Sequence, residues 1–146
     1  MSVRPVRIYG DPVLRERARE VTSVDDTLRQ LVADMRETMA AYGGVGLAAN
    51  QVGVAQRLLV VDVPVEEHAR ARHALINPVV RRRAGSVSGE EGCLSVPGLW
   101  EDVTRAERLV VTGLDEEGRE VELDVEGYLA RAIQHEMDHL DGVLFV

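Results

Sequence analysis

The chain has 146 residues, of which 45% are hydrophobic and 29% charged, and its formal net charge is -8 at pH 7. This composition indicates a globular protein that forms one domain over residues 1–146, and no apolar run reaches the ~18 residues of a membrane span. The negative charge argues against direct nucleic-acid binding, and the run Arg81, Arg82 and Arg83 is expected to be a solvated strand end or loop. Cys93 is the only cysteine and the N-terminus has no apolar signal segment, so we expect a cytoplasmic protein.

The first third of the chain is expected to contain one irregular arm and one helix. Residues 4–24 lack a regular apolar period, and Gly10, Asp11 and Pro12 indicate a turn within them. Residues 25–42 form the predicted amphipathic helix, because apolar side chains recur there at helical spacing. The glycine-rich stretch 44–51 lacks the Lys-Ser/Thr pair of a phosphate-binding loop, and its small residues allow another element or a ligand to approach the backbone closely.

The remainder of the chain is expected to contain strands followed by a final helix. The predicted strands cover residues 57–63, 74–81, 108–114 and 119–125, and the last two flank a hairpin loop at 115–118. The final helix is predicted from about 126 to 140. Its apolar face is formed by Leu129, Ile133, Met137 and Leu140.

The final helix carries a His-Glu-x-x-His motif. His135 and His139 are four residues apart and therefore lie on one face of the helix, where both imidazoles can bind the same metal ion. Glu136 can then act beside them as a proton carrier. The motif predicts a metal-dependent hydrolytic site.

A catalytic site of this kind usually has a third protein ligand, which must be found elsewhere in the chain. Phe145 occupies the position at which metzincins have their third histidine, and no glutamate follows His139. The upstream candidates are Cys93, His68, His73 and several carboxylates. The two histidines belong to a polar segment and are expected to face solvent, so Cys93 is favoured. A set of one sulfur and two nitrogen ligands suits zinc or iron better than calcium or magnesium.

Three segments, taken together and in this order, resemble the peptide deformylase family. They are Gly-Val-Gly-Leu-Ala-Ala-Asn-Gln at 44–51, Glu-Gly-Cys-Leu-Ser at 91–95 and Gln-His-Glu-Met-Asp-His-Leu at 134–140. The resemblance implies an α+β fold with antiparallel sheets around a central metal-binding helix. It implies removal of the formyl group from the N-terminal formyl-methionine of nascent polypeptides, with release of formate.

The resemblance also assigns roles to individual residues. It implies Cys93, His135 and His139 as ligands of one divalent metal ion, Fe2+ in the cell, with Zn2+, Ni2+ or Co2+ as substitutes. Glu136 would move the proton, while the Gln51 side chain and the Leu94 backbone N–H would stabilise the oxyanion. The residues expected around the substrate methionine are Val45, Gly46, Gly92, Tyr128, Arg131 and Ala132.

Other readings of the same residues remain open. The helix motif alone would also fit a metallopeptidase, and the whole pattern would fit a catalytically inactive relative. We further expect an ion pair between Glu91 and Arg105 that braces the Cys93 loop, and transient contact with the ribosome. Many family members continue beyond the position of Val146, so any function of that further segment is in doubt here.

Overall fold

The computed structural model describes residues 2–66 and 69–144, and it confirms the expected combination of antiparallel sheets and helices. Residue His68, considered above as a ligand, lies outside the described residues. No helix in the described ranges is both long enough and apolar enough to cross a membrane. The elements are η1 (Pro12–Arg15), α1 (Asp26–Ala41), β1 (Gly46–Ala48), η2 (Ala49–Val52), β2 (Leu58–Glu66), β3 (Ala69–Ala84), β4 (Val87–Cys93), β5 (Val96–Arg105), β6 (Arg108–Leu114), β7 (Glu120–Glu126) and α2 (Gly127–Leu140).

The main sheet is antiparallel throughout, with the strand order β1-β2-β3-β6-β7. Strand β2 is buried on both faces: Leu58 and Val60 pack in the cluster that contains α1, and Leu59 and Val61 pack in the cluster that contains α2. A strand buried on both faces needs a continuous apolar run instead of an alternating one. The sequence Leu-Leu-Val-Val at 58–61 meets that requirement.

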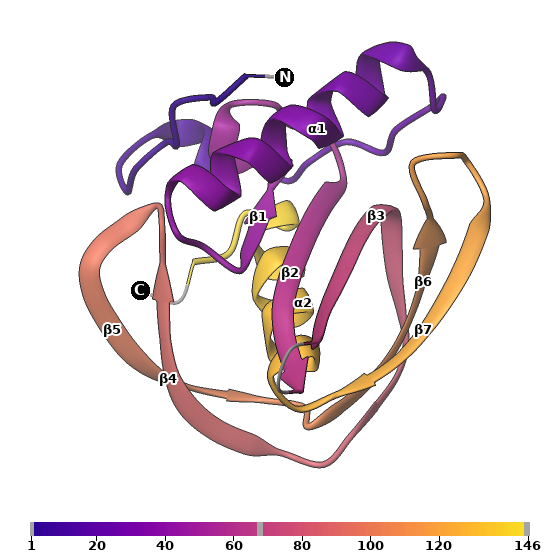
Figure 1. The fold of residues 1–146 in the computed structure, drawn as a ribbon. Helices are drawn as coiled ribbons and strands as arrows, with labels where there is room; N and C mark the ends of the chain where they lie inside the picture. The colour runs from indigo at the N-terminus through magenta and orange to yellow at the C-terminus, as the bar shows by residue number, and fades with distance from the viewer. Residues whose placement is uncertain (1, 67–68, 145–146) are drawn as a thin grey trace.

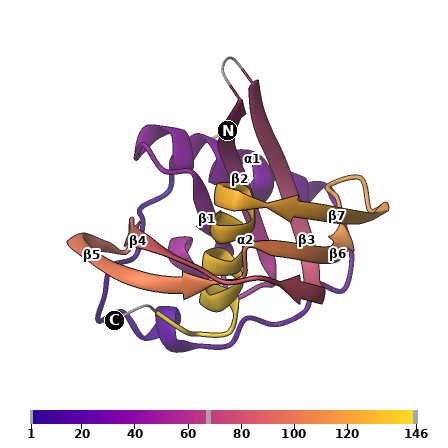
Figure 2. The ribbon, with the colours of Figure 1, turned by 90° about the horizontal axis from the view of Figure 1, so that it is seen from below.

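Helix α2 lies between the main sheet and a separate two-stranded hairpin formed by β4 and β5 (Figures 1 and 2). Its expected apolar face is confirmed for Leu129, Ile133 and Leu140, which are buried in the core, and Met137 packs against them. The opposite side of the helix therefore faces the hairpin, which is the side that carries the His-Glu-x-x-His motif. This arrangement makes α2 the central helix of the fold.

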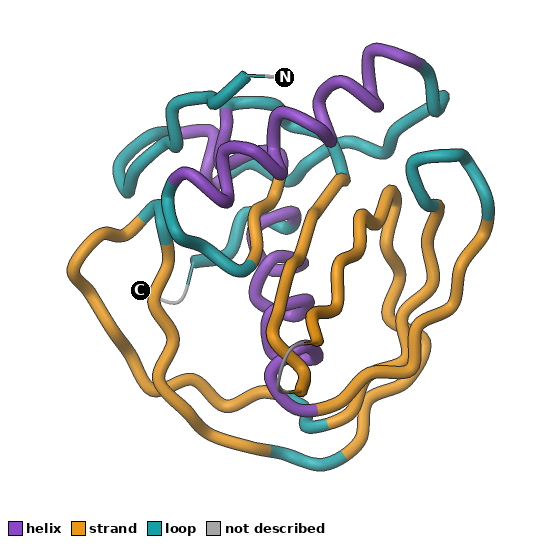
Figure 3. Tube along the Cα trace, in the orientation of Figure 1, coloured by secondary structure: helices purple, strands orange, loops and turns teal. Residues whose placement is uncertain are grey.

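The hairpin formed by β4 and β5 was not expected from the sequence, and β3 is longer than the predicted 74–81 (Figure 3). Most residues of β5 are exposed, and β4 has no regular alternation of buried and exposed positions. A strand without one consistently buried face leaves no apolar period of two in the sequence. The other predicted elements agree with the structure to within one to three residues at each end, and Arg81, Arg82 and Arg83 are exposed at the end of β3.

The N-terminal arm is largely irregular, as expected, but it is fixed to the rest of the fold by hydrogen bonds. The backbone N–H of Arg7 donates to the carbonyl of Gln51 at 2.7 Å, and that of Tyr9 donates to the carbonyl of Ser95 at 2.6 Å. At the start of the arm, the buried carboxylate of Asp34 on α1 accepts from the Ser2 N–H and from the Arg4 guanidinium. The arm therefore runs beside the loops that carry Gln51 and Cys93.

We expect the anchor at Asp34 to make a contribution to stability that depends on pH. Hydrogen bonds from Gln30, Ser2 and Arg4 hold the pKa of Asp34 below its usual 3.8, against the opposing effect of burial. The stabilisation is therefore complete above pH 3.8 and is lost as the pH falls through the lowered value. Thermal unfolding of the wild type and of Asp34→Asn should differ at pH 7 and converge at acidic pH, and a difference that stays constant with pH would contradict this role.

Candidate metal centre and active site

Three potential metal ligands converge between α2 and the tip of the hairpin. The Nε2 atoms of His135 and His139 lie 3.2 Å apart, and Cys93 Sγ lies 3.2 Å from His139 Nε2. All three donor atoms lie within 4.8 Å of one another, and no other such group of His, Cys, Asp or Glu occurs among the described residues. His73, the other candidate ligand within the described ranges, is half-buried on β3 and is not part of the group.

The donor set fits a divalent metal. Tetrahedral bonds of 2.0–2.3 Å to nitrogen and sulfur place neighbouring ligand atoms roughly 3.3–3.6 Å apart, close to the separations observed here. The helix brings the two imidazoles together by its i, i+4 spacing, and the turn after β4 brings Cys93 against them. One sulfur and two nitrogen donors leave a fourth position for water or substrate. The chain therefore contains a Cys-His-His metal-binding site.

Glu91 lies at the centre of a buried polar network beside these donors. Its carboxylate accepts from Arg105 Nη2 at 3.0 Å and from Arg131 Nη1 at 2.6 Å, and it lies 2.9 Å from His135 Nδ1. Burial favours the neutral acid, but His135 and Arg105 outweigh it and lower the pKa of Glu91 to about 2. The expected ion pair between Glu91 and Arg105 is thus confirmed, and Arg105 also pairs with Asp138 of α2.

The carboxylate of Glu136 lies in the same cavity as His135 and Cys93, and only 4% of the residue is exposed. Burial raises its pKa to about 7, with a smaller opposing effect from His135. Its Oε1 has no hydrogen-bond partner among the described residues. A buried carboxylate whose pKa lies near physiological pH, and which has an oxygen without a hydrogen-bond partner among the described residues, is suited to accept and release a proton.

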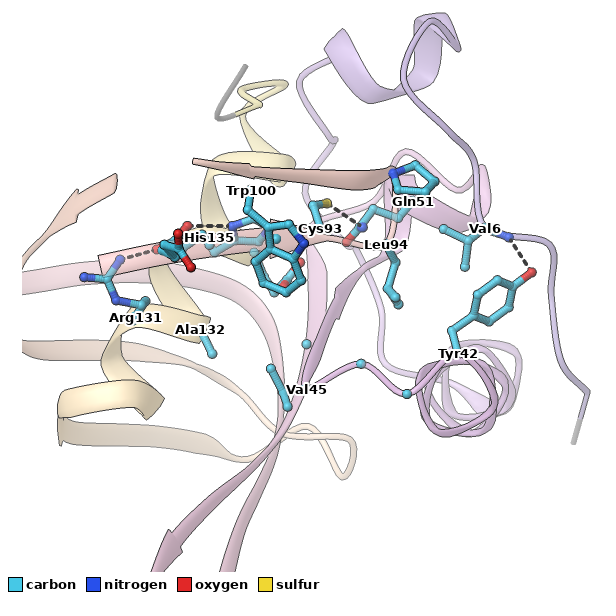
Figure 4. Close-up of a pocket in the computed structure, with 18 of the residues that line it drawn as sticks. Val6, Tyr42, Val45, Gln51, Cys93, Leu94, Trp100, Arg131, Ala132 and His135 are labelled. Atoms are coloured by element: carbon cyan, nitrogen blue, oxygen red, sulfur yellow. Dashed lines mark hydrogen bonds and ion pairs between the residues drawn. The ribbon is translucent and has the colours of Figure 1, made fainter. Parts of the chain in front are cut away.

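Gln51 in η2 faces the hairpin from the other side of the cavity. Its Oε1 accepts from the Ala48 N–H at 2.9 Å, which fixes the orientation of the carboxamide. Its Nε2 donates to Ser95 Oγ at 3.0 Å and lies 3.6 Å from Cys93 Sγ. The amide N–H group is therefore directed toward the cluster of donor atoms (Figure 4).

Cys93 and His135 line a cavity of about 610 Å³, shown in Figure 4, and His139 is buried behind them. The lining includes Gln51, Leu94 and every residue expected around the substrate, namely Val45, Gly46, Gly92, Tyr128, Arg131 and Ala132. Two of these residues, Tyr128 and Arg131, do not simply add apolar surface to the cavity wall. Tyr128 is 53% exposed, so it is not a core residue, and the guanidinium of Arg131 is occupied by Glu91 and by the carbonyls of Val87 and Val103.

Several residues of the cavity were not found by sequence reasoning. Val6, Ile8 and Tyr42 reach it from the N-terminal arm and the end of α1, and Trp100 reaches it from β5 (Figure 4). Trp100 is the only tryptophan of the chain and is 65% exposed. Its position in a polar segment was the one feature of the sequence that could have indicated a place in the cavity wall. Ser95 is fully buried against Gln51, a contact that no local pattern indicates.

Comparison with known proteins agrees with this geometry. The family model described as polypeptide deformylase matches residues 3–146. A peptide deformylase from Alkalilimnicola ehrlichii is 53% identical over 146 residues, which cover 100% of this chain and 82% of that protein. The chain belongs to the polypeptide deformylase family.

Solved structures of deformylases have the same fold. The crystal structure of peptide deformylase from Ehrlichia chaffeensis matches with a TM-score of 0.95 at 41% identity, over 99% of this chain and 86% of that one. The crystal structure of the deformylase from Thermus thermophilus matches with a TM-score of 0.90 at 53% identity, over 98% and 83%. Membership of the deformylase family identifies the chain as a metallohydrolase, and the Cys-His-His group is its metal-binding site.

Proposed function

We propose that this chain removes the N-formyl group from the formyl-methionyl end of nascent polypeptides, with the chemistry taking place at the Cys93, His135 and His139 cluster. The observation that carries the proposal is that the three donor atoms lie together beside one cavity, which the Glu136 carboxylate and the Gln51 amide also line. These groups come from three separate parts of the chain: η2 carries Gln51, β4 carries Cys93, and α2 carries the histidines and Glu136. A structural metal site would need neither a buried proton carrier nor an open cavity beside it.

The proposed ligands are Cys93 Sγ and the Nε2 atoms of His135 and His139, and the proposed metal is Fe2+, with Zn2+, Ni2+ or Co2+ as substitutes. When bound, such an ion supplies a water of lowered pKa at neutral pH. Glu91 contributes to this site without being a ligand, because its carboxylate accepts from Nδ1 of His135 and so orients Nε2 toward the donor cluster.

Glu136 is proposed to accept the proton of the attacking water and to deliver it to the nitrogen of the departing amine. As the water adds to the formyl carbon, negative charge grows on the carbonyl oxygen. The Gln51 Nε2–H and the backbone N–H of Leu94, which follows Cys93 in the hairpin turn, are proposed to donate to that oxygen. Cleavage of the C–N bond then yields formate and a free N-terminal methionine.

The remaining cavity is proposed to bind the methionine and the first residues of the peptide. Val45 and Ala132 offer apolar surface for the methionine side chain, and the backbone of Gly46 and Gly92 would lie beside the peptide. Tyr128 and the aliphatic part of Arg131 would complete this wall. We further propose that residues 1–146 act as one catalytic domain in the cytoplasm and meet the ribosome transiently, because the substrates are nascent chains.

Formyl-Met-Ala-Ser and unformylated Met-Ala-Ser provide the deciding test. We expect anaerobically prepared protein with one bound divalent metal per chain to release formate from the first peptide and to leave both peptide backbones intact. Formate can be measured with a coupled dehydrogenase and the peptide products by mass spectrometry. Cleavage of internal peptide bonds would indicate a metallopeptidase instead, and absence of any product from metal-loaded protein would indicate an inactive relative.

A further inference from the structure

Gly46 and Gly44 are glycines whose backbone conformation does not require glycine. Eight glycines of the chain have a positive φ between 65° and 104°, and neither Gly44 nor Gly46 is among them. Gly46 is paired with Val61 as the first residue of β1. Glycine weakens a strand, and where it occurs in one it often marks the close approach of another group. The reason for glycine at these two positions must therefore be sought in their neighbours.

The neighbour of Gly46 is the catalytic carboxylate proposed above. A Cβ placed on Gly46 would lie 2.5 Å from Oε2 of Glu136 and 3.1 Å from both Cγ and Cδ. Real Cβ atoms essentially never approach another heavy atom to less than 3.0 Å, so Glu136 would have to move. Glu136 is buried and its Oε1 has no hydrogen-bond partner among the described residues, so the position of the carboxylate depends on packing.

Gly44 has a different neighbour. A Cβ there would lie 2.8 Å from Cδ1 of Leu94, the residue whose backbone is proposed to bind the oxyanion. Gly44 and Gly46 flank a bend at Val45, and their bare backbone meets the hairpin turn at Gly44 and α2 at Gly46. The two glycines thus provide space for two different parts of the active site.

We propose that Gly46 is a positioning residue for Glu136: the absence of a side chain at this point of β1 creates the space in which the carboxylate is held. The proposal rests on the proposed function, because it concerns the proton carrier of that reaction. It assigns no chemical step to Gly46 itself. It differs from the substrate contact expected of the Gly46 backbone, since it concerns the Cα and the side of the strand that faces α2.

The test is the melting temperature of Gly46→Ala in three backgrounds, each with the same metal bound. In the wild-type background we expect a loss of several degrees. Glu136→Ala removes the clashing atoms, so adding Gly46→Ala to it should change the melting temperature by no more than about one degree. Glu136→Gln keeps the size of the side chain and should preserve the full loss, which separates a steric effect from an effect of charge.

Gly44→Ala is the matched control, because its added Cβ would meet Leu94 and not Glu136. Any loss of melting temperature in Gly44→Ala should be the same with Glu136 and with Glu136→Ala. An equal loss for Gly46→Ala in the wild-type and Glu136→Ala backgrounds would overturn the proposal. If Gly46→Ala alone fails to fold, the double variant with Glu136→Ala is expected to fold, and its failure would overturn the proposal equally.

Activity gives a second readout. Gly46→Ala is expected to keep one metal ion per chain and a KM within about twofold, while kcat falls at least about tenfold because the proton carrier is displaced. An unchanged kcat, or a rise in KM without loss of kcat, would contradict the proposed positioning. If the wild type itself releases no formate, the proposed function fails, but the melting temperatures still decide whether Gly46 positions Glu136.

Discussion

Glu136→Ala is expected to retain one bound metal ion per chain and to lose about 10²- to 10⁴-fold in kcat, the range typical of a general acid–base group. The carboxylate is not among the three clustered donor atoms, so metal binding does not require it. The other two carboxylates of the cavity lining are poor replacements for it. Glu91 is already paired with Arg105, Arg131 and His135, and Glu90 is exposed to solvent.

The measurement combines metal analysis with steady-state formate release from formyl-Met-Ala-Ser. Glu122→Ala is a suitable control, since Glu122 is exposed on β7, is not part of the cavity lining, and should leave kcat, KM and metal content unchanged when replaced. Near-normal turnover by metal-loaded Glu136→Ala would exclude the proposed mechanism. Loss of the metal in the same variant would instead show that the carboxylate is needed to hold the ion.

The local part of the site could be predicted from the sequence because it depends on helix geometry alone. His135 and His139 share a face of α2 by their spacing, and the structure brings their Nε2 atoms within 3.2 Å. Cys93 is 42 residues upstream of His135, so its place beside the two histidines followed only from the missing third ligand and from the family resemblance. The structure brings it to the cluster by the hairpin of β4 and β5, whose exposed strands left no apolar period.

Arg131 illustrates what the sequence could not decide. It was expected on the wall of the methionine pocket, and it does line the cavity, but its guanidinium is bound to Glu91 and to two carbonyls of the hairpin. The contact between Arg131 and Glu91 spans 40 residues and depends on how the hairpin packs against α2. Long-range pairing of this kind has no local signature in the sequence. The expected ion pair between Glu91 and Arg105, which are closer along the chain, is confirmed.

Glu91 itself is the position at which a single substitution should have the largest effect on stability. Its side chain is 5% exposed, and the two guanidinium groups bound to it are on side chains that are 10% exposed. Removing the negative charge leaves the buried Arg131 with carbonyl partners only and leaves Arg105 with Asp138 as its remaining anionic partner. Breaking a buried ion pair on one side typically costs about 3–5 kcal/mol. For a chain of this size, Glu91→Gln is therefore expected to lower the melting temperature by roughly 10 °C or more.

The same substitution should weaken metal binding by about 10- to 100-fold, the usual effect of losing the group that orients a histidine ligand. Glu90→Gln removes one carboxylate from the neighbouring exposed position and should change neither the melting temperature nor the metal affinity.

The pH dependence of the melting temperature adds a further check. The pKa of Glu91 falls from its usual 4.5 to about 2 in the folded chain, so its stabilisation is complete above pH 4.5 and is lost as the pH falls toward 2. The difference in melting temperature between wild type and Glu91→Gln should therefore disappear over that pH range. A difference that stays constant with pH would show that the network does not stabilise the fold. A loss of melting temperature in Glu91→Gln no larger than that in Glu90→Gln would show the same.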